Sequence, residues 1–256
     1  MRFIAALIIV ISNKCWGADP SILLFNQTTN KTIIAQAPDR VRSFASITKL
    51  MTAIVALDSD RSMYALLPLY SKMGSLLPQK RYTREELLTA MLVRSDNAAA
   101  ETIALDYPGG RVAFLKAMNQ KAQQLGMADT KFVDPTGLSV FNVSTTHDIV
   151  KLLKLSATTE FIRTTSVKKQ AIFETAAKRQ IRKIVLPNTN APMLFQFDNI
   201  VVTKTGLTNN AGWCVGLVVE QNSQIFYIVV LGAKNKQERF DKIKDIMYNH
   251  IIDKQF

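Results

Sequence analysis

Strand-like apolar runs lie at both ends of this chain, and a long helical stretch separates them. Near the N-terminus, two such runs flank the turn-forming residues 26–30, which predicts a β-hairpin over 21–36. Towards the C-terminus, stronger runs occupy 200–206, 212–220 and 224–232. The pattern predicts an α+β fold in which both chain ends form one antiparallel sheet, flanked by helices, with a helical subdomain inserted between its two halves.

The inserted stretch carries helical periodicity and helix-capping residues. Ser43 is predicted to cap a helix that runs to about Asp58. Because the apolar residues of this helix cover most of its circumference, we expect it to be buried in the centre of the fold. Thr83 and Glu86 form a capping box for the next helix. The segment 95–97 breaks the pattern and separates that helix from a third one.

These patterns divide the chain into two closely packed parts of one domain, without a linker. We assign 19–45 and 165–256 to the sheet part and 46–164 to the helical part. The segment 59–82 shows no clear period. A final amphipathic helix over 240–251 has a narrow apolar stripe, which favours packing on the sheet over membrane anchorage.

The first eighteen residues have the pattern of an export signal. Arg2 precedes the apolar run 3–11, and the small residues Gly17 and Ala18 follow. The run is too short to span a bilayer comfortably. We therefore predict a cleaved signal peptide over 1–18 and a periplasmic mature protein. The alternative interpretation is a buried N-terminal strand.

The chain is strongly basic, with a formal net charge of +12. Loss of Arg2 and Lys14 with the signal peptide lowers this charge by two. A charge of this size favours anionic partners. Export argues against nucleic acid, and leaves an anionic wall polymer or the membrane surface as a peripheral contact.

Cysteine and histidine are scarce, which limits the kinds of site that the chain can build. Cleavage of the signal peptide removes Cys15 and leaves Cys214 in an apolar strand, where it is most simply a small buried hydrophobe. His147 and His250 are the only histidines, and neither has a partner at metal-ligand spacing. We expect no metal and no cofactor.

Ser46 and Lys49 stand three residues apart at the start of the first predicted helix, so they lie one turn apart on one face. The lysine amine can then act as the base for the serine hydroxyl. The helix N-terminus would also stabilise an oxyanion there. This spacing alone is a weak signal. Ser166 and Lys169 repeat it, but no apolar helical run follows them, so we interpret that pair as a chance match.

A second group, Ser95, Asp96 and Asn97, lies between two predicted helices. All three residue types are common helix caps, and capping alone would explain them. The functional interpretation places Ser95 in the proton relay to a leaving group and Asn97 against a substrate amide.

A third group, Lys204, Thr205 and Gly206, ends a predicted strand. Strand alternation places Lys204 on the same face as Ile200 and Val202, where a cation is out of pattern unless it lines a cleft. Gly206 lacks a side chain where a substrate backbone must approach. The alternative is a solvated lysine at the end of a strand.

Together, and in this order, the three groups resemble the motifs of the low-molecular-mass penicillin-binding proteins, the D-alanyl-D-alanine serine peptidase family. The resemblance covers roughly residues 20 to 235 and includes the segments 44–53, 125–138 and 204–214.

Two segments, 107–110 and 142–145, are most similar to the D-alanyl-D-alanine endopeptidase branch of that family. The connection 59–82 looks shorter than in close relatives. Since the chain ends about fifty residues after Lys204, we expect neither a second β-rich domain nor a C-terminal anchor.

The resemblance implies a fold like that of β-lactamases and DD-peptidases, together with a set of site residues. The implied catalytic residues are Ser46, Lys49, Ser95, Asn97 and Lys204, and the implied substrate-binding residues are Thr205, Gly206 and Leu207. The backbone N–H groups of Ser46 and Leu207 would hold the oxyanion. We further expect that burial and the like charge of Lys204 lower the pKa of Lys49.

The implied activity is a penicillin-sensitive serine endopeptidase that hydrolyses peptidoglycan cross-links through an acyl-enzyme, with β-lactam antibiotics as covalent inhibitors. A carboxypeptidase that trims terminal D-alanine is the first alternative. A β-lactamase is disfavoured because no family-like glutamate segment lies between the second and third motifs. An alternative of another class is a catalytically silent peptidoglycan-binding protein, against which the complete set of motif residues argues.

Overall fold

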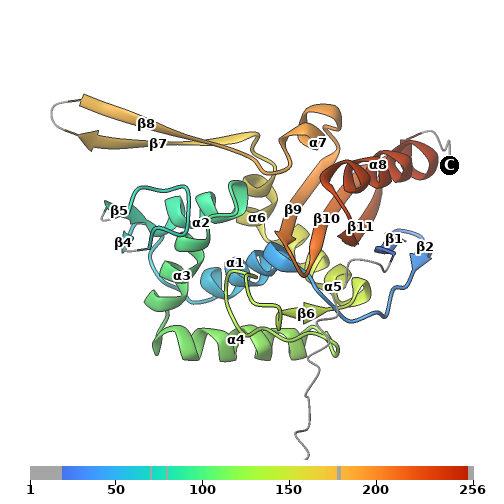
Figure 1. The fold of residues 1–256 in the computed structure, drawn as a ribbon, viewed down its shortest axis with the longest axis horizontal. Coiled ribbons are helices and arrows are strands. Elements are labelled where there is room, and N and C mark those ends of the chain that lie inside the picture. The colour runs from blue at the N-terminus through green and yellow to red at the C-terminus, as the bar shows by residue number, and fades with distance from the viewer. Residues whose placement is uncertain (1–18, 70, 79, 178–179, 253–256) are drawn as a thin grey trace, which may run out of the picture.

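The structure is a computed structural model that describes residues 19–69, 71–78, 80–177 and 180–252. The predicted signal peptide therefore lies outside the described residues. A helical block packs against one face of a central sheet, and a C-terminal helix covers the other face (Figure 1). Within the described part of the chain, no helix combines the length and the apolar character needed to cross a membrane.

The central sheet contains strands from both ends of the chain, which confirms the predicted topology. Its order is β2-β1-β11-β10-β9, and every neighbouring pair is antiparallel. The sheet consists of β1 (Ser21–Asn26), β2 (Lys31–Gln36), β9 (Ile200–Thr208), β10 (Gly212–Gln221) and β11 (Gln224–Ala233). Because β9 is an edge strand, its outer edge is free to face the helical block.

Apolar side chains cover both faces of the sheet, which explains why its C-terminal strands are so hydrophobic. Along β10, Val215 and Leu217 belong to the apolar cluster under the C-terminal helix. Cys214 and Val218 belong to the larger cluster shared with the helical block. Cys214 is fully buried, and burial raises the pKa of its thiol to about 11. It is therefore a small core residue.

The helices are short and are connected by tight turns. They are α1 (Thr48–Leu57), α2 (Arg84–Val93), α3 (Asn97–Asp106), α4 (Gly110–Gln124), α5 (Thr146–Thr158), α6 (Glu160–Ser166), α7 (Ala191–Gln196) and α8 (Lys236–Met247), which continues as a π-helical turn (Tyr248–Ile252). As expected, α1 lies in the centre, since every residue of 48–56 is buried. Helix α8 packs on the sheet through Ile243 and Met247, as its apolar stripe predicted. The capping box of Thr83 and Glu86 is present at the start of α2.

The start of the central helix differs from the prediction. Ser43 does not cap it: this residue lies in β3 (Arg42–Ser43), which pairs with β6 (Val143–Ser144). The chain enters α1 through a 3-10 turn (Ala45–Ile47), and Ala45 adopts a left-handed φ of 49°. The Cβ of a non-glycine residue disfavours this conformation, so the tertiary packing around the turn must hold it.

Strand alternation also fails once, in β9. A β-bulge opposite Val218 and Val219 shifts the register, so Ile200 joins the cluster under α8 while Val202 joins the other cluster. The predicted shared face of Ile200 and Lys204 is therefore wrong, because one extra residue in a strand reverses every side chain before it. Val202 and Lys204 keep the expected alternation.

Two hairpins lie outside the central sheet. The segment 59–82, which shows no period in the sequence, contributes β4 (Leu66–Leu69), and this strand pairs with β5 (Lys80–Thr83). A longer ribbon of β7 (Gln170–Ala177) and β8 (Gln180–Pro187) projects from the body above α2 (Figure 1).

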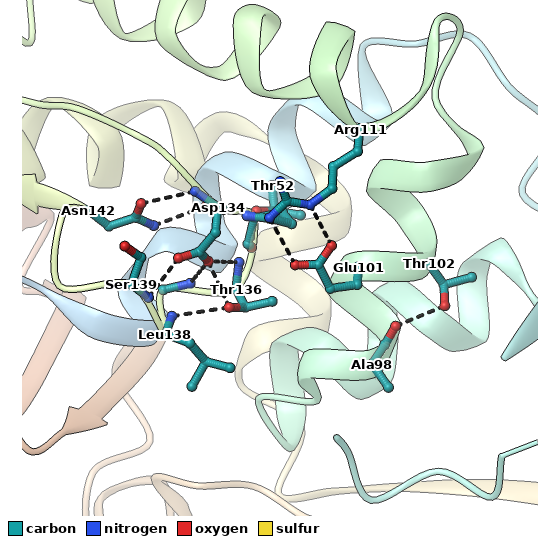
Figure 2. A network of polar contacts seen from close by, with 12 residues as sticks. Thr52, Ala98, Glu101, Thr102, Arg111, Asp134, Thr136, Leu138, Ser139 and Asn142 are labelled. Carbon is teal, nitrogen blue, oxygen red and sulfur yellow. Dashed lines mark hydrogen bonds and ion pairs between the residues drawn. The ribbon is translucent and has the colours of Figure 1, made fainter. Parts of the chain in front are cut away.

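A loop between α4 and α5 is fixed by a polar network that reaches the central helix (Figure 2). The carboxylate of Asp134 accepts hydrogen bonds from the backbone N–H groups of Thr136 (2.6 Å), Gly137 (2.6 Å) and Ser139 (2.7 Å). The Thr52 hydroxyl of α1 donates to the carbonyl of Pro135 at 2.6 Å. These contacts fix the path of the loop over the start of α1.

The fully buried Asn142 joins this loop to α1 a second time. Its Oδ1 accepts from the backbone N–H groups of Val133 (2.7 Å) and Asp134 (3.1 Å). Its Nδ2 donates to the Asp134 carbonyl (3.0 Å) and to the hydroxyl of Thr48 (3.1 Å), the first residue of α1. One side chain therefore satisfies two buried amides and bonds the loop to the helix.

Replacing Asn142 by Ala is expected to destabilise the fold by about 2–4 kcal/mol, because it leaves buried backbone groups without hydrogen bonds. Denaturant unfolding measures this change. The exposed Asn249, which bonds to Asp245 one turn earlier, provides the matched control. Equal stabilities for Asn142→Ala and Asn249→Ala would contradict the proposed support of the loop.

Candidate active site

Ser46 and Lys49 meet at the start of α1. The Lys49 Nζ lies 2.9 Å from the Ser46 Oγ. The amine is fully buried, whereas Ser46 is half-buried and lines a cleft of about 630 Å³. A hydroxyl that faces a cleft, with an amine behind it, is the arrangement needed to activate a nucleophile.

Two carbonyl oxygens complete the contacts of the Lys49 amine. The amide Oδ1 of Asn97, the first residue of α3, lies 2.6 Å from Nζ, and the backbone carbonyl of Thr136 also lies 2.6 Å away. A neutral amine has two N–H groups and one lone pair. Since both carbonyls can only accept, they take the two N–H groups, and the lone pair is left to face the Ser46 hydroxyl.

Burial lowers the pKa of Lys49 from 10.5 to about 7. The negative charges of Asp134, Asp96 and Glu101 oppose this effect and keep the value from falling further. The expected contribution of Lys204 to this lowering is not found; instead, the like charge of Lys49 lowers the pKa of Lys204. At neutral pH the amine is therefore present in both protonation states.

Lys204 supplies a second buried amine from the edge strand β9. It is 1% exposed, and its Nζ donates to the carbonyl of Thr205 at 3.0 Å. Burial and the charges of Lys49 and Arg239 hold its pKa well below the ordinary value. Strand β9 thus places a second amine directly beside the helix that carries the nucleophile.

Ser95 lies at the turn between α2 and α3 in a left-handed conformation, with φ of 65°. Its side chain lines the cleft and makes no hydrogen bond to the described residues. The neighbouring Asp96 caps α3 through the N–H of Ala99 (2.8 Å) and accepts from the N–H groups of Ser75 and Leu76. Capping therefore explains Asp96, whereas Ser95 lines the cleft and has no such structural role.

Two glycines allow other segments to approach the backbone of the nucleophile. Gly137 has a φ of 83°, and a Cβ there would lie 2.0 Å from the carbonyl oxygen of Ala45. A Cβ at Gly206 would lie 2.8 Å from the Phe44 oxygen and 3.1 Å from the Ser46 nitrogen. Only residues without a side chain fit at such separations.

The residues indicated by the sequence converge on this cleft. Its lining includes Ser46, Ser95, Asn97, Thr205, Gly206 and Leu207, while Lys49 and Lys204 lie buried behind it. Thr205 is held by a 2.7 Å hydrogen bond to the hydroxyl of Thr189. Leu207 is 49% exposed at the rim. Among the described residues, no group of three His, Cys, Asp or Glu side chains is placed to hold a metal ion.

Sequence reasoning missed two groups of the site. The Thr136 carbonyl orients Lys49, but a backbone group leaves no mark on a pattern of side chains. Arg239 of α8 also lines the cleft; it is 4% exposed, and its Nε has no hydrogen-bond partner among the described residues. One sequence feature could have identified Arg239: it is a charged residue on the apolar side of a helix that was expected to pack on the sheet.

The second serine–lysine pair is not part of this site. Ser166 is fully buried at the end of α6, where its hydroxyl accepts from the backbone N–H of Thr203. The Nζ of Lys169 lies over the ring of Phe195, 4.4 Å from its centroid. The interpretation of a chance match is consistent with both positions.

Comparisons with known proteins agree with this geometry. The family described as D-alanyl-D-alanine carboxypeptidase matches residues 17–235. A D-alanyl-D-alanine endopeptidase of Escherichia coli is 40% identical over 87% of this chain and 74% of its own length. The Streptomyces K15 DD-transpeptidase superposes with a TM-score of 0.82 at 26% identity, over 89% of this chain and 94% of that one.

A penicillin-binding protein D2 of Listeria monocytogenes, solved in its cefotaxime-bound form, is similar with a TM-score of 0.78 at 29% identity, over 89% of this chain and 94% of that one. The family match spans most of the chain and includes all three motifs of the cleft. The chain therefore belongs to the D-alanyl-D-alanine carboxypeptidase family of serine-type DD-peptidases.

Proposed function

We propose that this chain is a serine D-alanyl-D-alanine endopeptidase that hydrolyses peptidoglycan cross-links through an acyl-enzyme, with Ser46 as the nucleophile. One observation carries the proposal: a buried amine with a pKa of about 7 lies 2.9 Å from a hydroxyl that faces a cleft. The names of its relatives in Escherichia coli and Pseudomonas aeruginosa support the endopeptidase assignment.

Acylation begins when neutral Lys49 takes the proton of the Ser46 hydroxyl. The Ser46 oxygen attacks the carbonyl carbon of a D-alanine, and the carbonyl oxygen becomes an oxyanion. The backbone N–H groups of Ser46 and Leu207 are the proposed donors to that oxyanion, since Gly206 brings β9 against the Ser46 nitrogen. The 3-10 turn at the start of α1 adds partial positive charge there.

The intermediate collapses when the bond to the leaving amine breaks and that nitrogen gains a proton. Ser95, which lines the cleft without a protein partner among the described residues, is the proposed relay: it gives its hydroxyl proton to the nitrogen and regains the one that Lys49 took from Ser46. Lys204 lies buried behind the cleft and is proposed to assist this proton transfer from Ser95. Water then attacks the ester carbonyl, and Ser46 leaves with the proton returned through Lys49.

The buried guanidinium of Arg239 is proposed to bind an anion in the part of the cleft that holds the leaving group. A carboxylate on the departing residue would supply the partner that its Nε lacks among the described residues. Both a cross-link and a free D-alanine end carry such a carboxylate. Trimming of terminal D-alanine is therefore the second candidate, and the name of the matching family favours it.

β-Lactams are proposed to acylate Ser46 by the same attack, with the opened ring remaining as the acyl group. The cefotaxime-bound relative supports this proposal. The stable ester arises where the leaving nitrogen stays tethered and blocks the approach of water.

We also propose that residues 1–18 direct export and are removed, so the mature protein acts in the periplasm and contacts the anionic wall or membrane surface through its excess of basic residues. The intact mass of the protein recovered from a periplasmic extract is expected to match a chain that begins at Asp19. A recovered chain that still begins at Met1 would contradict this.

Incubation of the purified protein with cross-linked muropeptide dimers and with free pentapeptide tests the main proposal. Mass analysis is expected to show monomers released from the dimers, with slower loss of D-alanine from the pentapeptide. Loss of D-alanine alone would instead support the carboxypeptidase alternative. Binding of dimers without any product would support a silent wall-binding protein.

The two serines with the same local spacing provide the matched variants. Ser46→Ala is expected to abolish both cleavage and covalent labelling by penicillin. Ser166→Ala should retain both, because that hydroxyl is buried away from the cleft. Penicillin labelling of Ser46→Ala would refute the assignment of the nucleophile.

Penicillin acylation should depend on pH through the base. Because Lys49 has a pKa of about 7 and must be neutral to accept a proton, the rate constant should fall about tenfold per pH unit below that value and level off above it. Stopped-flow or quenched labelling from pH 5 to 9 measures the profile. Lys49→Arg, whose side chain stays protonated, should be slower by at least about 10²-fold at every pH. A flat wild-type profile would rule out Lys49 as the base.

A further inference from the structure

A separate pocket of about 280 Å³ lies beyond the cleft, where β9 turns into β10. It is formed by the β9–β10 turn, the end of β11 and the chain just before the nucleophile. Its lining includes Arg42, Leu207, Asn209, Asn210, Trp213 and Lys234. Of the residues given a role in the reaction above, only Leu207 lines it.

Two side chains join this pocket to the cleft. Leu207 and Trp213 line both hollows. The Cζ of Arg239 also lies 5.3 Å from the centroid of the Trp213 ring, within cation–π range. A molecule that fills the pocket would therefore contact Trp213, whose ring packs against the anion-binding Arg239 of the cleft.

The acyl part of the substrate must leave the nucleophile in the direction of this pocket. The leaving amine lies towards Ser95 and Lys204, so the acyl chain extends the other way along β9, past Leu207. In the first direction, the hydroxyl groups of Thr203 and Thr205 are bonded to the side chains of Asn190 and Thr189. An extended peptide can pair with the open part of this edge strand.

The pocket has the charge and the position to receive an anionic group of that peptide. Arg42 and Lys234 line it from two sides, and its lining among the described residues includes no Asp or Glu. Gly232 makes room for the Arg42 guanidinium, since a Cβ there would lie 2.3 Å from its Nη2. Strand β9 ends at Thr208, one residue after Leu207, so the pocket begins where the open edge of the strand ends.

We propose that this pocket binds the acyl-donor peptide through a free carboxylate on the residues that precede the scissile D-alanine. This inference rests on the proposed function and adds a substrate preference to it: acidic stem peptides are favoured over neutral ones. Lys234 is the test residue because its side chain is exposed, whereas Arg42 is packed against the backbone of β11.

Two matched muropeptide dimers test the proposal, one with that carboxylate free in the donor stem and one with it converted to a carboxamide. Wild type is expected to show a kcat/KM about fivefold higher or more for the carboxylate dimer, the size of a partly exposed ion pair. Lys234→Ala should bring the ratio near one, Lys234→Arg should preserve it, and Lys234→Glu should invert it. Lys242→Ala, an exposed lysine of α8 outside the pocket, should keep the wild-type ratio.

Equal rates for the two dimers with wild type would overturn this proposal while leaving the proposed function intact. A wild-type preference that survives Lys234→Glu would overturn it as well, because the carboxylate would then bind elsewhere. Cleavage of neither dimer would refute the endopeptidase function and this inference with it.

Discussion

Two lysine amines are buried, and no carboxylate of the described residues bonds to either; this is the constraint on which the rest of the structure depends. A charged amine loses its hydration in the interior, and the pKa of about 7 for Lys49 instead of 10.5 corresponds to about 5 kcal/mol. Below pH 7, where the amine is charged in both the folded and the unfolded chain, the folded state bears this cost in full. The same displacement makes the amine a base at neutral pH.

The surrounding elements can be understood as the means of holding these amines in place. The central helix is buried on all sides and carries Lys49, while the edge strand of a sheet covered on both faces carries Lys204. A loop fixed by Asp134 and Asn142 supplies the Thr136 carbonyl, and the start of α3 supplies Asn97. Each contact comes from a different part of the chain, so the site forms only when the whole domain has folded.

Much of the fold could be predicted because its elements have strong local signals. The three C-terminal strands are long apolar runs, and the capping box at Thr83 is a local pattern. The motif residues could be placed on elements for the same reason. What escaped prediction depends on tertiary contacts: the left-handed entry at Ala45, the β-bulge in β9 and the backbone carbonyl of Thr136. Ser43 was a misleading cap signal, because pairing with β6 outweighs the capping preference of serine.

The burial of the Cys214 thiol has a consequence for how this protein meets oxidants. With a pKa of about 11 and no exposed surface, it holds almost none of the thiolate that attacks disulfides or reacts with peroxide. Oxidants and disulfide catalysts therefore do not react with Cys214 in the folded chain. In the folded protein this thiol therefore stays reduced where an exposed thiol would be oxidised.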